Sequence, residues 1–517
     1  MSDRTRWVGL LFISIAVSLI IVDSTIVNVA IPSIVDELKI DSTQVQCVQT
    51  AYTLVFAALL IPFGTLADRI GRRRLLVAGV AVFTAASVFA GLSPDGPFLI
   101  ASRVLQGVGG AMVLPATTSL INATFRGRER AIAFAIWGST IGGMAAVGPL
   151  LGGWLTTDFS WRWAFGVNVP FGIAVIVGAF FTVTESAAGR RDRFDLLGAV
   201  LSVVAAGSLV FGLIQGRSLG WWMPTDETAA WWGLPISPVP VAFGMAIIAT
   251  VVFIAWERAR ARHGRATMLP LDLFTIATFR NGNIVAMLIS LGELGLLFVI
   301  PLWLQNVLNY SALQAGFILL ALAVGSFLAS GAVTGLSRRL SATGILRVGV
   351  ALELIALIAL GLALRSDMDW LPLAALLFLY GLGLGLASAQ VTNVVLADVP
   401  IEESGRASGT QSTSRQVGSA LGVATLGTLL FSSLAVHLAD RLGDLPTQQQ
   451  DQIIDAVTDT AGAAIPGLSN DPATSQIGQL AADAFTQAAS TTAFGAAAFL
   501  VIALIATLFL RRARVGV

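Results

Sequence analysis

Six charged side chains lie within or beside long apolar stretches of the sequence: Asp23, Arg103, Glu293, Glu353, Asp398 and Arg415. Burying a charge in an apolar environment is costly, so such residues are by default candidates for function. Loss of water favours the neutral form of a carboxyl group, whereas a nearby arginine favours the ionised form. A site that alternates between these two conditions can take up a proton and release it.

Asp23 and Arg103 are predicted to share one polar site. Asp23 lies about 16 residues into its apolar stretch, or ~24 Å, and Arg103 lies about 6 residues, or ~9 Å, into a stretch of the opposite direction. Both therefore fall in the same half of the apolar layer. We expect them to couple proton movement, together with Glu293, because the two histidines, His263 and His437, lie outside the apolar stretches. The alternative is a fixed ion pair that only holds two helices together.

Glu293 lies near the middle of its apolar stretch, between Gly292 and Gly295, which leave room for a ligand or for water. A buried anion attracts organic cations, and does so more strongly as water is excluded. Glu293 is therefore predicted to help select cationic substrates; the alternative is a side chain that only hydrogen-bonds to a neighbouring helix. A structural role is also the main alternative for Glu353. The predicted substrate site comprises Asp23, Glu293, Glu353, Gln390 and Asn393.

These residues are embedded in a chain that is too apolar for a soluble protein. Of the 517 residues, 56% are hydrophobic and 12% are charged, and the mean hydropathy is +0.82. Soluble proteins carry about 25% charged residues. The composition therefore excludes a soluble enzyme, a disordered protein and a disulfide-linked secreted domain, and it predicts an all-α integral membrane protein.

The charges and cysteines narrow the function further. A net charge of +1 excludes nucleic-acid binding through bulk charge. Lys39 is the only lysine, so the chain lacks the phosphate-binding sequence GxxxxGK[ST] of ATP-driven machines. Two histidines and the single Cys47 are too few for a metal cluster of those residue types. We therefore expect no metal and no cofactor, with an ion gradient as the source of energy.

Fourteen stretches are long and apolar enough to span a membrane as helices. They cover residues 8–30, 46–66, 75–93, 97–121, 131–154, 164–184, 195–214, 239–256, 282–304, 312–334, 343–364, 371–397, 411–435 and 488–510. With a cytoplasmic N-terminus, most arginines fall in inside loops, and the outside loops hold only Lys39, Arg162, Arg217, Arg365 and Arg441. This bias follows the positive-inside rule. We expect a multi-pass protein of the bacterial cytoplasmic membrane with both termini in the cytoplasm.

The first six and the last six spans look like two related halves. The fourth span contains LQGVGGAMVLPATTS and the twelfth LYGLGLGLASAQVTN, and an Arg-Ala pair opens both the fifth and the thirteenth. Transporters are often built from such repeats, with the substrate site at the repeat interface. We predict a six-helix bundle over 1–190, an inserted helix pair over 191–265 and a second six-helix bundle over 266–517. The second bundle includes a long outer loop, 436–487, which we expect to form a partly helical cap.

The loop between the second and third spans reads GTLADRIGRRRLL from Gly64. Gly64 and Gly71 permit close helix contact and a tight turn, and Asp68 can cap a helix N-terminus or pair with an arginine. This loop resembles the signature GxLaDrxGrxxxL of the major facilitator superfamily (MFS). In the second half, Ser337 stands where the aspartate would be. The resemblance implies a gate between two helix bundles, formed by Gly64, Asp68, Arg69, Gly71 and Arg72.

Three further sequences resemble the fourteen-span drug:H+ antiporters of the QacA/EmrB type. The first span ends VDSTIVNVAIP from Val22, and the fourth contains RVLQGVGGA, whose Arg103 matches the arginine that this family ties to proton coupling. The fifth span ends GPLLGG, like the antiporter motif GPxxGG, with Met144 where a small residue is usual. Close helix packing is the alternative role of its glycines. The motif comprises Gly148, Pro149, Gly152 and Gly153.

The resemblance covers essentially the whole chain and implies the MFS fold, with two six-helix bundles plus two inserted helices. It also implies a proton-coupled exporter of hydrophobic, in particular cationic, drugs that acts as a monomer among membrane lipids. One alternative is an exporter of a lipid or endogenous metabolite on the same scaffold. Another is a membrane sensor or scaffold without transport, against which the paired charges and the gate argue.

Overall fold

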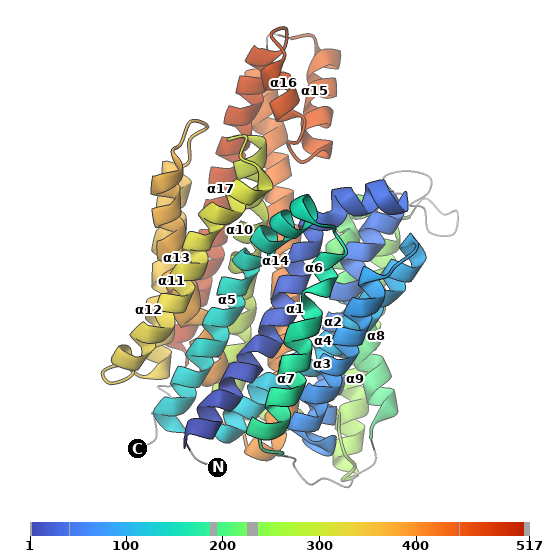
Figure 1. Ribbon diagram of the computed structural model, residues 1–517, viewed down its shortest axis with the longest axis vertical. Coiled ribbons are helices and arrows are strands. Elements are labelled where there is room, and N and C mark those ends of the chain that lie inside the picture. The colour runs from blue at the N-terminus through green and yellow to red at the C-terminus, as the bar shows by residue number, and fades with distance from the viewer. Residues whose placement is uncertain (1–2, 41, 187–193, 225–235, 444, 511–517) are drawn as a thin grey trace.

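The computed structural model describes residues 3–40, 42–186, 194–224, 236–443 and 445–510. Long helices run side by side over most of these ranges (Figure 1). Helix α1 begins and helix α17 ends at the same end of the molecule, which we call the terminal end. The short helices α15 and α16 lie at the opposite end, which we call the cap end.

The first bundle contains six spans. Its fourth helix starts where Asp95 accepts a hydrogen bond from the backbone N–H of Phe98 at 2.8 Å, which satisfies one of the free donors of a helix N-terminus. Its second and third helices are separated only by Gly71, whose φ of +107° is a conformation that glycine adopts without strain. The helices are α1 (Asp3–Leu38), α2 (Ser42–Ile70), α3 (Arg72–Gly91), α4 (Gly96–Thr124), α5 (Gly127–Asp158), and α6 (Trp163–Gly166) with α7 (Asn168–Thr182).

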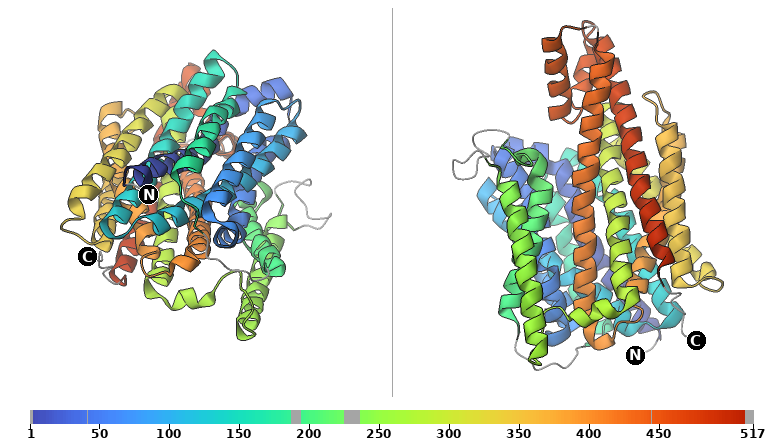
Figure 2. Two further views of the ribbon diagram at one scale, coloured as in Figure 1. Left: turned by 60° about the horizontal axis from the view of Figure 1, so that its bottom comes forward. Right: turned by 180° about the vertical axis from the view of Figure 1, so that it is seen from behind.

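Two helices lie between the bundles in sequence and pack together at one side of the molecule (Figure 2). They are α8 (Leu196–Leu219) and α9 (Pro238–Arg262), and α8 also packs against α2 and against α14 of the second bundle. Asp195 caps α8 by accepting from the N–H of Gly198 at 3.0 Å. A short 3-10 helix, η3 (Leu271–Thr275), leads from α9 into the second bundle.

The second bundle also has six long helices, and two of them, α14 and α17, begin well before the predicted spans. The polar segment Ser404–Thr410 belongs to the same helix as the thirteenth span although hydropathy excludes it, because packing against the first bundle buries it. The helices are α10 (Ala277–Asn306), α11 (Ala312–Leu336), α12 (Ala342–Ala363), α13 (Trp370–Val395), η4 (Ile401–Glu403), α14 (Ser404–Arg441) and α17 (Ser475–Leu508).

Two short helices fill the long outer segment between α14 and α17. They are α15 (Thr447–Asp459) and α16 (Ile465–Asn470). Val457 and Ile465 are buried against the bundle, and the side-chain amide of Asn306 at the end of α10 donates to the carbonyl of Ala461 at 2.9 Å. The cap is thus partly helical and is attached to the second bundle.

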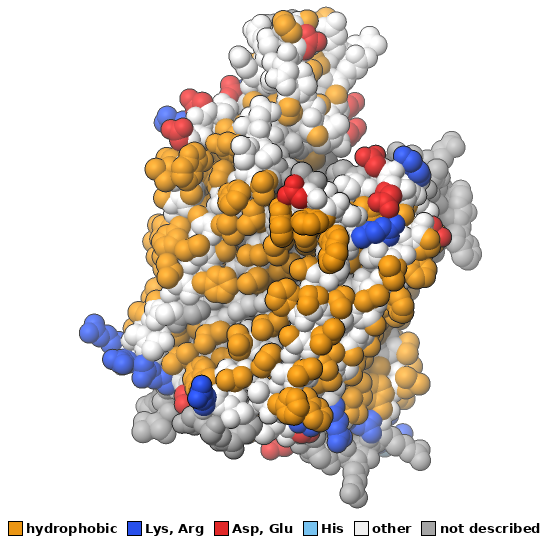
Figure 3. Space-filling model, viewed as in Figure 1, with side chains coloured by type: hydrophobic (Ala, Val, Ile, Leu, Met, Phe, Trp, Pro, Cys, Tyr) orange, Lys and Arg blue, Asp and Glu red, His pale blue; other side chains and the backbone are white. Residues whose placement is uncertain are grey.

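The prediction of fourteen spans is confirmed within the described ranges. Thirteen helices are long and apolar enough to cross a membrane, and α5 supplies one more as a bent pair, Gly127–Met144 and Val147–Thr156, with a 41° bend. Pro149 explains the bend, because a proline within a helix lacks the N–H donor and clashes with the carbonyl four residues earlier. Figure 3 shows exposed apolar side chains over the middle of one face and charged side chains toward both ends.

The two bundles meet along α2 and α14 and along α5 with α11 and α13. Glycines bring the backbones together toward the terminal end. A Cβ on Gly64 would lie 2.5 Å from the carbonyl oxygen of Gly405, and one on Gly138 would lie 2.7 Å from the Cα of Ala389. These distances leave no room for a side chain, so the bundles are in direct backbone contact.

Candidate functional site

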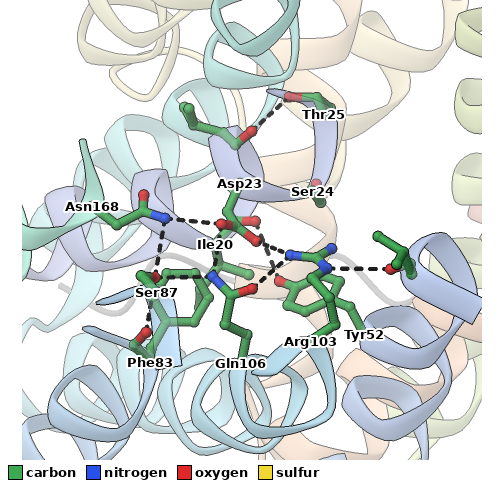
Figure 4. A network of polar contacts seen from close by, with 12 residues as sticks. Ile20, Asp23, Ser24, Thr25, Tyr52, Phe83, Ser87, Arg103, Gln106 and Asn168 are labelled. Carbon is green, nitrogen blue, oxygen red and sulfur yellow. Dashed lines mark hydrogen bonds and ion pairs between the residues drawn. The ribbon is translucent and has the colours of Figure 1, made fainter. Parts of the chain in front are cut away.

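Asp23 lies at the centre of a buried polar network inside the first bundle (Figure 4). One carboxylate oxygen pairs with the guanidinium of Arg103 at 2.5 Å. The other accepts hydrogen bonds from the side-chain amides of Gln106 at 2.9 Å and Asn168 at 2.8 Å. Both amides also donate to the hydroxyl of Ser87, at 2.9 Å and 3.2 Å. The predicted proximity of Asp23 and Arg103 is confirmed, and three donors serve the carboxylate.

The Arg103 guanidinium is enclosed on its other sides. Its Nε donates to the carbonyl of Val48 at 3.3 Å, and its central carbon lies 4.4 Å from the ring centroid of Tyr52. The Tyr52 hydroxyl in turn donates to the carbonyl of Ile20 at 3.3 Å. The aromatic face stabilises the cation where water is excluded. The ion pair is therefore held from α1, α2 and α4 together.

The antiporter motif packs α5 against the helix that carries Asp23. A Cβ on Gly148 would lie 1.8 Å from the hydroxyl oxygen of Thr25, and a Cβ on Gly152 would lie 3.0 Å from the carbonyl of Ile26. Gly153 points elsewhere, toward Leu313 of the second bundle at 4.0 Å. The motif therefore fixes α1 just beyond Asp23 and reaches the facing bundle.

Asp68 connects the two bundles at the terminal end. Its carboxylate accepts from the backbone N–H groups of Gly405 at 2.9 Å and Arg406 at 3.0 Å, in the first turn of α14. An anion is favoured there because these N–H groups lack partners within the helix. Arg72 binds the same carboxylate at 2.9 Å and also donates to the carbonyl of Ile401. We call Asp68, Arg72 and the start of α14 the latch.

The loop around the latch has further anchors. The carboxylate of Glu185 accepts from the backbone N–H of Arg73 at 3.2 Å and of Arg74 at 3.1 Å, and it crowds the Cβ position of Gly71. Arg69 does not join the latch contacts described above; its guanidinium lies 5.7 Å from the ring centroid of Phe194, next to the inserted pair. Glu185 was not predicted, because an acid in a polar loop gives no signal in the sequence.

The second half has a counterpart of the latch with different chemistry. Arg128, at the start of α5, donates to the hydroxyl of Ser337 at 3.0 Å and to the carbonyl of Thr334 at 2.6 Å, at the end of α11. A cation at a helix C-terminus is favoured for the same reason that an anion is favoured at an N-terminus. The missing aspartate of this half is thus matched by an arginine from the facing bundle.

Gln390 and Asn393 of the predicted substrate site lie in the contact between the bundles near the latch. Gln390 donates to the carbonyl of Ala131 at 3.1 Å, and Asn393 accepts from Arg130 at 2.9 Å. Nearby, Asn122 donates to Ser404 at 2.7 Å. These bonds connect the two bundles at the terminal end, and a role for Gln390 and Asn393 in substrate binding stays a prediction.

Glu293 is buried in the second bundle, and it is paired. Its carboxylate accepts from the hydroxyl of Ser388 at 2.8 Å and lies 3.5 Å from the guanidinium of Arg415. Arg415 also donates to Ser290 and to Ser388, both at 3.2 Å. Glu353 is fully buried on α12. The second bundle therefore has an acid–arginine pair of its own.

The inserted pair carries a polar cluster that sequence reasoning missed. Glu257 accepts from the backbone N–H groups of Met268 at 3.1 Å and Leu269 at 3.3 Å. The carbonyl of Met268 accepts from Thr65 of α2 at 2.9 Å. The segment that leads into the second bundle is thus held between the inserted pair and the helix that carries Asp68. In the sequence Glu257 directly follows an apolar stretch, so it resembles a solvent-exposed residue at the end of a span.

Comparison with known proteins agrees with this architecture. The Major Facilitator Superfamily profile matches residues 13–423. The chain is 34% identical to the probable actinorhodin transporter of Streptomyces coelicolor over 85% of this chain and 75% of that protein. It is 33% identical to the puromycin resistance protein pur8 of Streptomyces alboniger over 88% of both chains. It is 31% identical to the multidrug efflux pump LfrA of Mycolicibacterium smegmatis over 86% and 84%.

Two solved structures share the fold. The human organic anion transporter MFSD10 (TETRAN) covers 98% of this chain and 100% of its own, with a TM-score of 0.62 and 12% identity. The proton:xylose symporter XylE covers 90% and 96%, with a TM-score of 0.57 and 13% identity. The family match, together with the relatives named above, identifies a membrane transporter and not an enzyme. The chain belongs to the major facilitator superfamily, and the relatives named above are a probable transporter, an antibiotic resistance protein and a multidrug efflux pump.

Replacing Asp68 by Ala should slow turnover with little change in substrate affinity. The change removes the acceptor of two backbone N–H groups and of Arg72, so the closed terminal end loses at least ~1.5 kcal/mol, or roughly tenfold in population. Maximal transport rate and half-saturating concentration measure the two effects. Asp68→Asn keeps one acceptor oxygen and should be intermediate. A large loss of affinity at an unchanged maximal rate would contradict this role.

Replacing Asp23 by Asn should abolish proton-coupled transport while the protein stays folded and inserted. Arg103→Ala should be as damaging, because it leaves the carboxylate buried without its counter-charge. The double variant should be no worse than either single variant, because both changes disrupt the same interaction. Transport rates under a pH gradient, at matched expression, give the four corners of the cycle. Strict additivity would show that the two residues act independently.

Proposed function

We propose that this transporter is a proton-coupled exporter of hydrophobic compounds, in particular organic cations. The observation that carries the proposal is the Asp23–Arg103 pair, a charge pair buried in one bundle while the latch closes the terminal end. The arginines at the ends of the spans favour placing the terminal end in the cytoplasm of a bacterium. The conformation is then closed to the cytoplasm.

In the proposed cycle a proton binds Asp23 and removes the negative charge that holds Arg103. The guanidinium then lacks its counter-charge in a dry site, which destabilises the local packing of α1 and α4. The contacts of Gly148 and Gly152 pass a shift of α1 to α5, and α5 lines the contact between the bundles. Protonation of Asp23 is thereby coupled to opening of the contact between the bundles.

The latch separates the two access states. When the terminal end opens, Asp68 leaves the first turn of α14, and both the carboxylate and the freed N–H groups become hydrated. Alternating access in such transporters is largely a rigid-body movement of one bundle against the other. The direct backbone contact at Gly64 and Gly405 then breaks as a unit, without repacking of side chains.

Glu293 is proposed to favour cationic substrates. Its carboxylate lies 3.5 Å from the guanidinium of Arg415, so an organic cation that enters the site can replace Arg415 as the counter-charge. The names of the relatives support the breadth of the substrate class, since they include an actinorhodin transporter, a puromycin resistance protein and a multidrug pump.

A lipid or an endogenous metabolite is the second candidate substrate. One observation favours the lipid: an apolar groove of about 250 Å³ between α2, α8 and α9, lined by Leu54, Phe211, Val241 and Met245 among others. Such a groove can hold an acyl chain beside the bundle. Transport assays with the purified protein in liposomes distinguish between these candidate substrates. The experiment needs no partner protein, because members of this superfamily typically act as monomers.

The proposed function is tested in proteoliposomes that contain only this protein. An imposed pH gradient should drive uptake of ethidium, a lipophilic cation, and dissipation of the gradient should stop it. Fluorescent phospholipid movement is measured in the same vesicles. Asp23→Asn serves as the inactive control. Gradient-independent movement of ethidium would contradict proton coupling, and lipid movement without ethidium movement would establish the second candidate.

Replacing Glu293 by Gln should weaken binding of cationic compounds more than that of neutral compounds of similar size. Gln keeps the volume and can still bond to Ser388, but it lacks the charge that attracts a cation, whose effect grows as water is excluded. Binding affinities at fixed pH, for charged and neutral analogues, give the comparison. Equal losses for both classes would leave Glu293 as a packing residue or a second proton carrier.

A further inference from the structure

The second bundle contains a carboxyl group that the proposed cycle does not use. Glu353 in α12 is fully buried, and neither of its carboxylate oxygens has a hydrogen-bond partner among the described residues. Tyr380 in α13 is also buried, and its hydroxyl has no hydrogen-bond partner among the described residues. Buried polar atoms are nearly always paired, so two unpaired groups in one bundle call for an explanation.

Glu353 and Tyr380 belong to one cluster. A Cβ on Gly383 would lie 2.6 Å from the backbone nitrogen and 2.8 Å from the Cγ of Glu353, so α12 and α13 are in close contact there. Gly383 follows Tyr380 by three residues and thus lies on the same face of α13. The charges of Glu293 and Arg415 act on Glu353, and those of both glutamates act on Tyr380.

The charges in this cluster do not balance if both acids are ionised. Arg415 supplies one positive charge, and it lies 3.5 Å from Glu293, which also accepts from Ser388. Glu293 therefore has the counter-charge and a donor, whereas Glu353 has neither. A carboxylate without donors in an apolar site is strongly disfavoured, and the neutral acid is the form that such a site holds.

We propose that Glu353 is a second proton-binding site, occupied by a proton while the terminal end is closed. The proposal rests on the proposed proton-coupled function for its meaning in transport. It assigns Glu353 to protons and not to contact with the transported compound. A metal ion is not favoured, since the described ranges hold no group of three or more His, Cys, Asp and Glu side chains placed to bind one.

Release of the proton from Glu353 follows when the bundle opens. Water then reaches Glu353, its O–H bond breaks, and the proton passes to that water. The Tyr380 hydroxyl can donate to the new carboxylate, and the unpaired Nη1 of Arg415 is a second donor in the cluster. The two bundles thus hold opposite forms in one conformation: an ionised Asp23 with three donors, and a neutral Glu353 with none.

Infrared spectroscopy of the purified full-length protein at neutral pH tests the bound proton directly. A neutral carboxylic acid has a carbonyl stretching band that a carboxylate and an amide lack. Glu353→Gln should remove this band, and it should leave thermal stability unchanged because Gln is neutral and of the same size. Asp23→Asn should keep the band. A protein without the band, or a Glu353→Gln variant that retains it in full, would overturn the proton site.

A second measurement tests the role in transport. The ethidium gradient that balances a given pH gradient, at zero membrane potential, reports the number of protons per substrate through its slope. The slope should fall from about two to about one in Glu353→Gln. Asp455→Asn, at an exposed position on α15, is the matched control and should keep the original slope. An equal slope in the native protein and Glu353→Gln would refute the coupling role of Glu353, whereas ethidium movement insensitive to the gradient in the native protein would refute the proposed function.

Discussion

Asp23 and Arg103 neutralise each other at a depth where water is excluded, and the first bundle is arranged around that pair. Gln106 and Asn168 occupy the remaining acceptor sites of the carboxylate, and the ring of Tyr52 covers the guanidinium. A charge removed from either residue leaves the other without compensation. The helices that carry the pair also contact α5, which in turn contacts the facing bundle, so the pair is connected to the bundle interface by packed helices.

The first half contacts the second half at the terminal end through two opposite charges. The first half offers the carboxylate of Asp68 to the free N–H groups of α14, and the first half also offers Arg128 to the free carbonyl groups of α11. Both contacts use a helix end of the second bundle, where backbone groups lack partners. Whether an anion or a cation binds is determined by the helix end that it meets, an N-terminus in α14 and a C-terminus in α11, and not by a repeated sequence.

The sequence predicts the spans, the proximity of Asp23 and Arg103, and the capping chemistry of Asp68, because charge, apolar length and depth are local properties. It does not predict that Asp68 meets α14, since contacts between distant segments depend on how the bundles pack. Ser87 and Asn168 escape notice because polar residues without charge are common in spans. Ser404 to Thr410 look like a loop, and only the contact with the first bundle makes a buried helix of them.

The bond from Thr65 to Met268 has a consequence for how the halves move. Glu257 of the inserted pair accepts a hydrogen bond from the same short segment. Thr65 lies about one turn of α2 before Asp68. These hydrogen bonds hold the connecting segment between α2 and the inserted pair of α8 and α9, at one side of the molecule (Figure 2). A movement that parts the two bundles therefore has to accommodate this tie as well as the latch, and it also has to break the bonds from Arg128 to the end of α11.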